Sequence, residues 1–229
     1  MLLGSSGCRA DLFFALTDLL RNPAPPPGHL TGMLAAPDVS ASSPVYVRNL
    51  VHTLDQIDAL VRRLVREVTE RQIHWQPPGG RSWSIAQCLD HLTVTNSLYV
   101  TAIRQAVDDA KPDRAEPNTA IRPGLLERLF LWNTEPPPKV KLRAAAQIDP
   151  NPQRKRGDLW FAFAHAEERI RRLMIESATI DVNRTRFVNP LLRGIRFTIG
   201  TGFLIVLAHN RRHLWQAQRV RETAGFPAA

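Results

Sequence analysis

Apolar side chains recur at intervals of three and four residues along four long segments of the chain. In the first segment, which begins at Val45, the apolar positions are Val47, Leu50, Leu54, Ile57, Val61, Leu64 and Val68. This spacing places them on one face of a helix. A second helix is predicted from Ser84 to about Asp109, because Ser84 and Gln87 form an S-x-x-Q capping box that satisfies free N–H groups at a helix start.

Two further helices are predicted in the second half of the chain. One side of the third carries Trp160, Phe163, Ile170, Leu173 and Met174. The fourth follows an irregular stretch from Asp181 to about Thr198 and ends with the stop signals Gly225 and Pro227. No alternation of apolar and polar residues predicts a strand convincingly. The expected fold class is therefore all-α, and four amphipathic helices indicate a four-helix bundle.

Clusters of proline mark the connections between these helices. The short link at 77–80 predicts that the first two helices are antiparallel. A Pro-rich connection from Ala110 to about Pro152 follows the second helix and contains a short predicted helix at Gly124 to Trp132. Its roughly 40 residues can run the length of a bundle, which allows helices two and three to be parallel. We expect residues 1–44 to be a poorly ordered N-terminal tail and residues 45–227 to be the bundle domain.

The charge balance is basic, with 30 Lys and Arg against 21 Asp and Glu and a pI of about 10.7. This excess permits contact with nucleic acid or anionic lipid. We do not expect nucleic-acid binding, because the chain has no helix-turn-helix, zinc-finger or aromatic–basic strand pattern. Only two cysteines are present, which argues against a disulfide framework and fits a cytoplasmic protein. No apolar run reaches the roughly 18 residues of a membrane span.

Candidate chemistry lies in the fourth helix, where His209 and His213 are spaced by four residues. Two imidazoles one helical turn apart can chelate one metal ion. Gln216 lies on the same face, and the apolar neighbours of that face are Ile205, Val206, Ala217 and Val220. Polar rings in an apolar stripe need partners, although the spacing by itself is a weak motif. Asn210 stands where H-E-x-x-H proteases carry their general base, so we do not expect peptide hydrolysis by that mechanism.

His91 is the candidate for a third ligand, about two turns into the second helix. The residues alone leave open whether it binds metal or is a core-edge histidine bonded to a carbonyl. Near it, we interpret Cys88 as a packed apolar residue and Trp83 as a side chain that packs over the helix entry. Arg212 flanks the ligand face and either attracts an anionic substrate or remains solvated. Ordinary surface or edge roles are expected for two other histidines, His52 and His165.

Two segments resemble the DinB-like superfamily. Residues 83–92, WSIAQCLDHL, are similar to the entry of helix two in that family, and residues 208–220, AHNRRHLWQAQRV, are similar to its last helix with the signature H-x-x-x-H-x-x-Q. The similarity covers roughly Val45 to Pro227. It implies a four-helix bundle with an up-down-down-up course and a metal site formed by His91, His209 and His213. Gln216 would then contact a ligand or a bound water from outside the site.

The resemblance also implies a class of activity. The family includes transferases that use low-molecular-weight thiols such as bacillithiol, thiol-dependent isomerases related to mycothiol chemistry, and many members with no known activity. Three histidines and an open position are typical of a catalytic site for one divalent ion, here Zn, Ni, Fe or Mn. We therefore expect a metal-dependent thiol transferase acting on a small thiol and a small electrophile. The alternatives are a metal-dependent hydrolase and a non-catalytic, metal-braced bundle that binds a partner through its basic surface. A homodimer also remains open.

Overall fold

Four long helices dominate the computed structural model, which describes residues 39–79, 82–110, 120–140, 148–151, 154–192 and 194–228. They are α2 (Val45–Glu67), α4 (Ile85–Asp108), α6 (Arg156–Glu176) and α7 (Ile199–Arg221). The shorter elements are α3 (Glu70–His74), α5 (Leu125–Thr134), the 3₁₀ helix η2 (Ser177–Thr179), and strands β1 (Arg186–Val188) and β2 (Arg196–Thr198). The predicted tail, residues 1–44, lies outside the described residues except for 39–44.

The start of α4 shows how local sequence sets a helix boundary. The Ser84 hydroxyl accepts a hydrogen bond from the Gln87 N–H at 3.2 Å, and the Gln87 side chain accepts one from the Ser84 N–H at 2.9 Å. This reciprocal capping box is the one predicted from the S-x-x-Q pattern. Because it begins α4 at Ile85, the following turns place His91 on a buried face of the helix.

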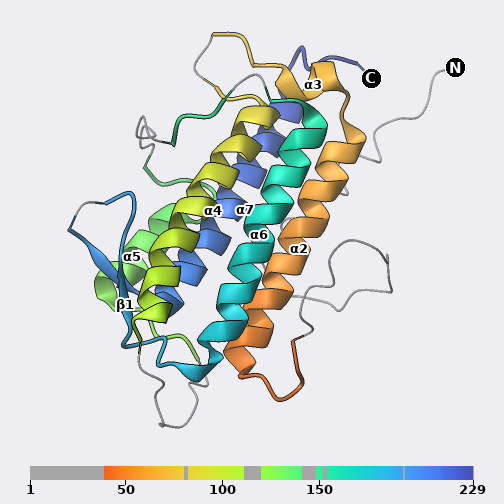
Figure 1. Ribbon diagram of the computed structural model, residues 1–229. Helices are drawn as coiled ribbons and strands as arrows, with labels where there is room; N and C mark the ends of the chain where they lie inside the picture. The colour runs from red at the N-terminus through yellow and green to blue at the C-terminus, as the bar shows by residue number, and fades with distance from the viewer. Residues whose placement is uncertain are drawn as a thin grey trace, which may run out of the picture. The chain divides into compact units, whose positions relative to one another are not determined.

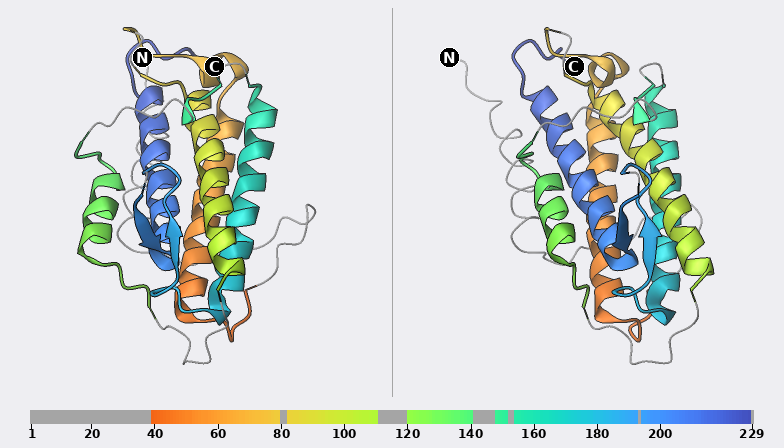
Figure 2. Two further views of the ribbon diagram at one scale, coloured as in Figure 1. Left: turned by 60° about the vertical axis from the view of Figure 1, so that its left-hand side comes forward. Right: turned by 90° about the vertical axis from the view of Figure 1, so that its left-hand side faces the viewer.

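The four long helices pack side by side, with α4 between α6 and α7, and α2 against α6 and α7 (Figures 1 and 2). Their shared core contains Leu54, Leu89, Phe163 and Phe203, all of which are fully buried. At one end, Arg221 of α7 pairs with Glu67 of α2 at 3.0 Å. Asp90, near the start of α4, pairs with Arg154 just before α6 at 3.2 Å. The ends of α2 and α7 therefore neighbour each other, as do the starts of α4 and α6.

Helices form most of the described chain, which is consistent with the predicted all-α class, and a small antiparallel sheet accompanies them. Strands β1 and β2 pair with Phe187 opposite Phe197, within the stretch that the sequence indicated as irregular. The sequence did not indicate these two strands, because three residues are too few to show a period of two. The Phe187 ring lies against Gly202, where an added Cβ would be 2.6 Å from its Cε1 atom. The hairpin thus packs directly on the first turns of α7.

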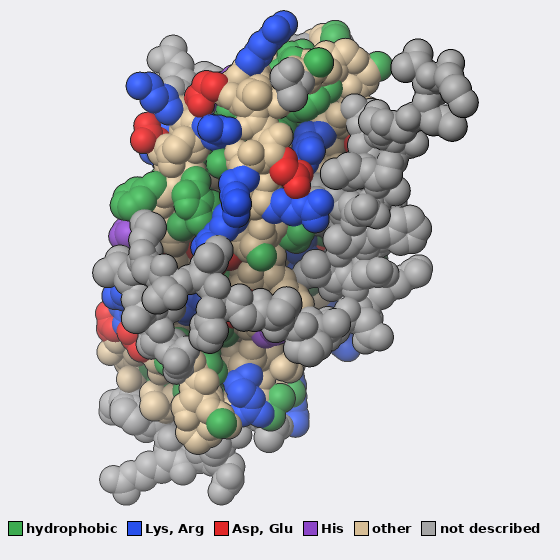
Figure 3. Space-filling model, turned by 90° about the vertical axis from the view of Figure 1, so that its right-hand side faces the viewer, with side chains coloured by type: hydrophobic (Ala, Val, Ile, Leu, Met, Phe, Trp, Pro, Cys, Tyr) green, Lys and Arg blue, Asp and Glu red, His purple; other side chains and the backbone are tan. Residues whose placement is uncertain are grey.

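Charged side chains are dispersed over the face that Figure 3 shows. Lys and Arg side chains lie at many heights along it, with Asp, Glu and apolar side chains between them. This mixture is typical of a solvated surface. Among the described residues, no helix is both long enough and apolar enough to cross a membrane.

Candidate metal centre

Helices α4 and α7 bring the three predicted histidines together. His91 Nε2 lies 3.3 Å from His209 Nε2, and His213 Nε2 lies 3.1 Å from the same atom. All three rings can offer one nitrogen within 4.8 Å of the others. His91 and His213 are 2% and 7% exposed, whereas His209 retains partial exposure. The i, i+4 spacing on α7 supplies two rings, and the packing of α4 against α7 supplies the third.

A backbone carbonyl fixes the tautomer of His91. Its Nδ1 lies 2.8 Å from the carbonyl oxygen of Ile148, which can only accept a hydrogen bond. Nδ1 therefore carries the proton in the neutral ring, and Nε2 presents its lone pair to the other histidines. A carbonyl or carboxylate in this position commonly orients the histidine ligands of metal ions.

Burial keeps all three rings neutral. It lowers the pKa of His209 to about 3, with further lowering by His91 and Arg212. The pKa of His213 lies well below its usual value, and that of His91 is also lowered, in both cases chiefly because burial penalises the charged ring. Neutral imidazoles are the form that binds metal.

A divalent cation fits this arrangement of nitrogen atoms. The bare Nε2 of His91 faces the Nε2 of His209, which also faces the Nε2 of His213, and a single N–H proton cannot serve both close pairs. Tetrahedral metal–nitrogen bonds of about 2.0–2.1 Å place neighbouring nitrogen atoms about 3.3 Å apart, close to the separations found here. The donor set of three neutral imidazoles suits Zn, Ni or Fe better than the oxygen-seeking Mg or Ca.

Trp83 closes one side of the histidine cluster. Its ring centroid lies 4.7 Å from that of His91 and 5.6 Å from that of His213, with the latter pair nearly parallel. Trp83 lies at the entry of α4, as the sequence predicted. The sequence did not indicate that its ring contacts two of the histidines. Its ring excludes water from that side of the site.

The segment that precedes α6 supports His91 from outside. The buried Asp90 carboxylate accepts a hydrogen bond from the Asn151 N–H at 2.6 Å and pairs with Arg154. Asn151 is three residues from Ile148, whose carbonyl oxygen accepts the hydrogen bond from His91 Nδ1. Sequence reasoning missed these residues, because the contacts join positions about sixty residues apart and no motif covers the connection.

Two arginines beside the α7 histidines hold α5 and the residues after it. Arg212 donates to the carbonyl oxygens of Asn133 at 3.1 Å and Val140 at 3.4 Å. Arg211 pairs with Glu135. The prediction left Arg212 either solvated or ready to attract an anion; the structure shows that it is partly buried and anchors backbone close to the site.

Asn210 does not belong to the histidine cluster and instead forms hydrogen bonds with other buried polar residues. It donates to the buried Glu167 carboxylate at 3.0 Å and accepts from Asn96 at 3.0 Å. Asn96 also donates to Glu167 at 2.6 Å. The residue that replaces the protease general base thus helps to join α4, α6 and α7 through a buried polar cluster.

The other predicted residues take separate roles. Gln216 is half-buried, and a polar contact from its amide opposes the lowering of the His213 pKa. Cys88 is fully buried, and burial raises the pKa of its thiol. His52 lies 3.0 Å from Gln56 and His165 is exposed; among the described residues, the cluster with metal-binding geometry includes neither of them.

Comparison with known proteins places the chain in a family. A family model described as the DinB superfamily matches residues 53–217. No curated protein and no solved structure is similar enough to the chain to count as a match. The matched region includes α4, α6 and all three clustered histidines, and it spans well over half of the 229 residues. The chain therefore belongs to the DinB superfamily.

Proposed function

We propose that His91, His209 and His213 bind one divalent metal ion and that the protein is a transferase that uses a low-molecular-weight thiol. The observation that carries this proposal is that the Nε2 atoms of His91 and His213 both lie within 3.3 Å of the Nε2 atom of His209, where α4 packs against α7. The proposed architecture is a four-helix bundle with an up-down-down-up course. The contacts at the helix ends and the chain direction in Figures 1 and 2 support it.

The chain's own residues prepare this site for a charged reactant. Ile148 orients His91, and Trp83 shields two rings from water. His209 is the one residue of the three that is not fully buried, so we propose that reactants approach from its side. Arg212, whose charge lowers the pKa of all three histidines, lies close enough to attract an anionic thiol or carboxylate.

A divalent ion held by His91, His209 and His213 would lower the pKa of a thiol and withdraw electron density from a carbonyl. In the proposed reaction the thiol proton leaves to solvent, the sulfur forms a bond to an electrophilic carbon, and the leaving group departs with its electron pair. Because three neutral ligands leave the full charge of the ion in place, the histidine set favours this chemistry over a site built from carboxylates.

The proposal is tested by loading the protein with zinc, nickel, iron or manganese and offering several small thiols with a chlorodinitrobenzene as electrophile. We expect metal-dependent release of chloride that His209→Ala abolishes and His165→Ala, a histidine of α6 outside the cluster, retains. Absence of turnover with every thiol and metal would contradict the transferase assignment. Hydrolysis of a substrate without thiol would instead favour the metal-dependent hydrolase, and bound metal without any turnover would favour a structural site.

A further inference from the structure

Exposed apolar side chains gather on one face, formed by α5 and the β1–β2 hairpin. Nine large apolar side chains of the described chain are exposed, and seven of them lie on these elements or beside them: Leu125, Leu126, Leu129, Trp132, Val140, Val188 and Ile195. We call these seven side chains the α5–hairpin face. Leu125 is 83% exposed, Leu126 80%, Leu129 60% and Trp132 56%. A helix of a water-soluble fold ordinarily points such side chains inward, so their exposure indicates a binding surface.

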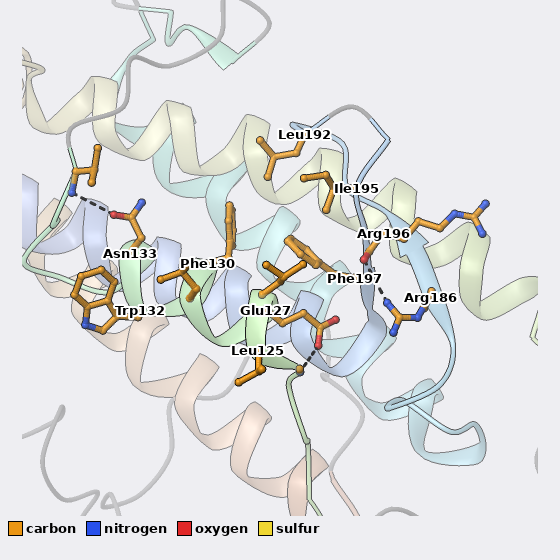
Figure 4. Close-up of a pocket in the computed structure, with 14 residues that line it drawn as sticks. Leu125, Glu127, Phe130, Trp132, Asn133, Arg186, Leu192, Ile195, Arg196 and Phe197 are labelled. Carbon is orange, nitrogen blue, oxygen red and sulfur yellow. Dashed lines mark hydrogen bonds between the residues drawn. The ribbon is translucent and has the colours of Figure 1, made fainter.

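The face contains an apolar groove between α5 and the hairpin (Figure 4). Its volume is about 710 Å³, and its walls include Leu129, Phe130, Leu192, Ile195 and Phe197. Phe130 and Phe197 form the floor, with ring centroids 5.2 Å apart. Leu125 and Trp132 also border the groove, and in Figure 4 they extend from the side of α5 opposite Phe130. The face therefore offers both projecting side chains and a recess.

Cations surround this apolar surface, and its carboxylates are already engaged. The stretches 120–140 and 184–198 contain seven Lys and Arg against two Glu. Burial by itself would raise the pKa of Glu127. Hydrogen bonds from the N–H groups of Thr198 and Gly124 have the larger effect, so the pKa is lowered. Glu135 pairs with Arg211. The charge left for a partner is positive, and Lys139 lies 5.5 Å from the centre of the Trp132 ring.

We propose that the α5–hairpin face binds the surface of an anionic lipid bilayer. Exposed Leu and Trp on a short helix, flanked by Lys and Arg, are typical of segments that lie in the interface of a membrane without crossing it. The Leu and Trp side chains enter the boundary between headgroups and acyl chains, and Arg122, Arg128, Arg186 and Arg196, all exposed, contact the phosphates. A second copy of the chain is a poorer partner, because its identical face would oppose cations with cations.

The proposal is tested with the full chain and vesicles of phosphatidylcholine, with or without phosphatidylglycerol. We expect co-sedimentation with the anionic vesicles, little with the neutral ones, and weaker binding as salt rises. The variant L125S/L126S/W132A removes three mostly exposed side chains, and its binding is expected to fall about tenfold or more. The variant R122Q/R128Q/R196Q tests the charge separately and is expected to lose the preference for anionic vesicles.

Matched controls lie on other elements. Phe161→Ser removes an apolar side chain of α6 that is 61% exposed, and R66Q/R71Q removes two exposed arginines of α2 and α3. Both are expected to bind vesicles as the unmodified protein does. The proposal is overturned if the chain does not bind anionic vesicles at low salt, or if the controls weaken binding as much as the α5–hairpin variants. It is also overturned if the chain self-associates in solution and L125S/L126S/W132A abolishes that association, since the face would then be a dimer interface.

Discussion

His91 depends on residues that lie far from it in the sequence. Its Nδ1 atom is held by the Ile148 carbonyl, and the neighbouring Asp90 binds the backbone of Asn151 and the side chain of Arg154. These interactions hold the segment from Ile148 to Arg154 against the start of α4. The position of that segment therefore determines which nitrogen of His91 faces the other histidines.

Asp90→Asn is expected to weaken metal binding without unfolding the protein. An amide lacks the charge that pairs with Arg154, so the segment that carries Ile148 is held less firmly and His91 is oriented less well. Loss of such supporting contacts typically costs about 10- to 100-fold in metal affinity. Calorimetric titration with zinc measures the change, and Asp108→Asn, an exposed carboxylate at the end of the same helix, is the control. Equal affinities for the two variants would show that Asp90 does not position His91.

The sequence predicted some of these residues and not others for physical reasons. The His209 and His213 pair follows from helical periodicity, which depends only on local spacing. His91 could be added only through the resemblance of residues 83–92, because periodicity does not show which helices pack together. Ile148, Asn151 and Arg154 lie at the end of a Pro-rich connection, where no repeating pattern indicates the path of the backbone.

At the scale of elements, the long helices were predictable and the hairpin was not. Apolar residues at three- and four-residue steps over more than twenty positions indicate a helix strongly, and the capping box located the start of α4. Strands β1 and β2 have three residues each, and their pairing depends on Phe187 and Phe197 packing against α5 and α7. Tertiary contacts of this kind leave no local period in the sequence.

Gly202 of α7 makes the close packing of the hairpin possible. A Cβ at this position would lie 2.6 Å from Cε1 of Phe187 and 3.1 Å from Cδ1 of Ile103. Although alanine favours a helix over glycine by about 1 kcal/mol, overpacking a buried contact costs about 1–3 kcal/mol. Gly202→Ala is therefore expected to lower the free energy of unfolding, measured by urea denaturation.

Gly157 provides the matched control on α6, because an added Cβ there meets no atom within 4 Å. Gly157→Ala is expected to leave stability unchanged or to raise it by up to about 1 kcal/mol. If both alanine variants were equally stable, the close approach of Phe187 to α7 would not be a constraint on the fold.

For the whole molecule, a buried polar cluster predicts how stability changes with pH. Glu167 connects α6 to Asn96 of α4 and Asn210 of α7, and burial followed by the nearby Asp58 raises its pKa well above 4.5. Burial also raises the pKa of Asp58 to about 7. The folded state thus retains protons that the unfolded state loses, and stability falls as pH rises above the unfolded values towards these folded ones.

Glu167→Gln is expected to reduce this fall, because glutamine accepts the same two amide hydrogen bonds and does not ionise. Between about pH 5 and about pH 8, the free energy of unfolding should therefore decrease less in the variant than in the unmodified protein. The difference is up to about 1.4 kcal/mol for each pH unit in which folded Glu167 keeps a proton that the unfolded chain has lost. Urea unfolding of metal-free protein measures it. The lowered pKa values of the histidines act in the opposite direction, reducing stability as pH falls below about 6.5, but equally in both proteins. Glu176→Gln, at an exposed carboxylate of the same helix, is the control. If stability depended on pH in the same way in both variants, Glu167 would not be a source of the pH dependence.

The central claim is that three histidines from two helices bind one metal ion. Calorimetric titration of metal-free protein with zinc tests it most directly, in the unmodified chain, in His209→Ala and in His165→Ala. We predict one ion per chain for the unmodified protein and for His165→Ala, and an affinity lowered by more than about 100-fold in His209→Ala. Absence of binding to the unmodified protein, or equal affinity and stoichiometry in all three, would contradict the claim.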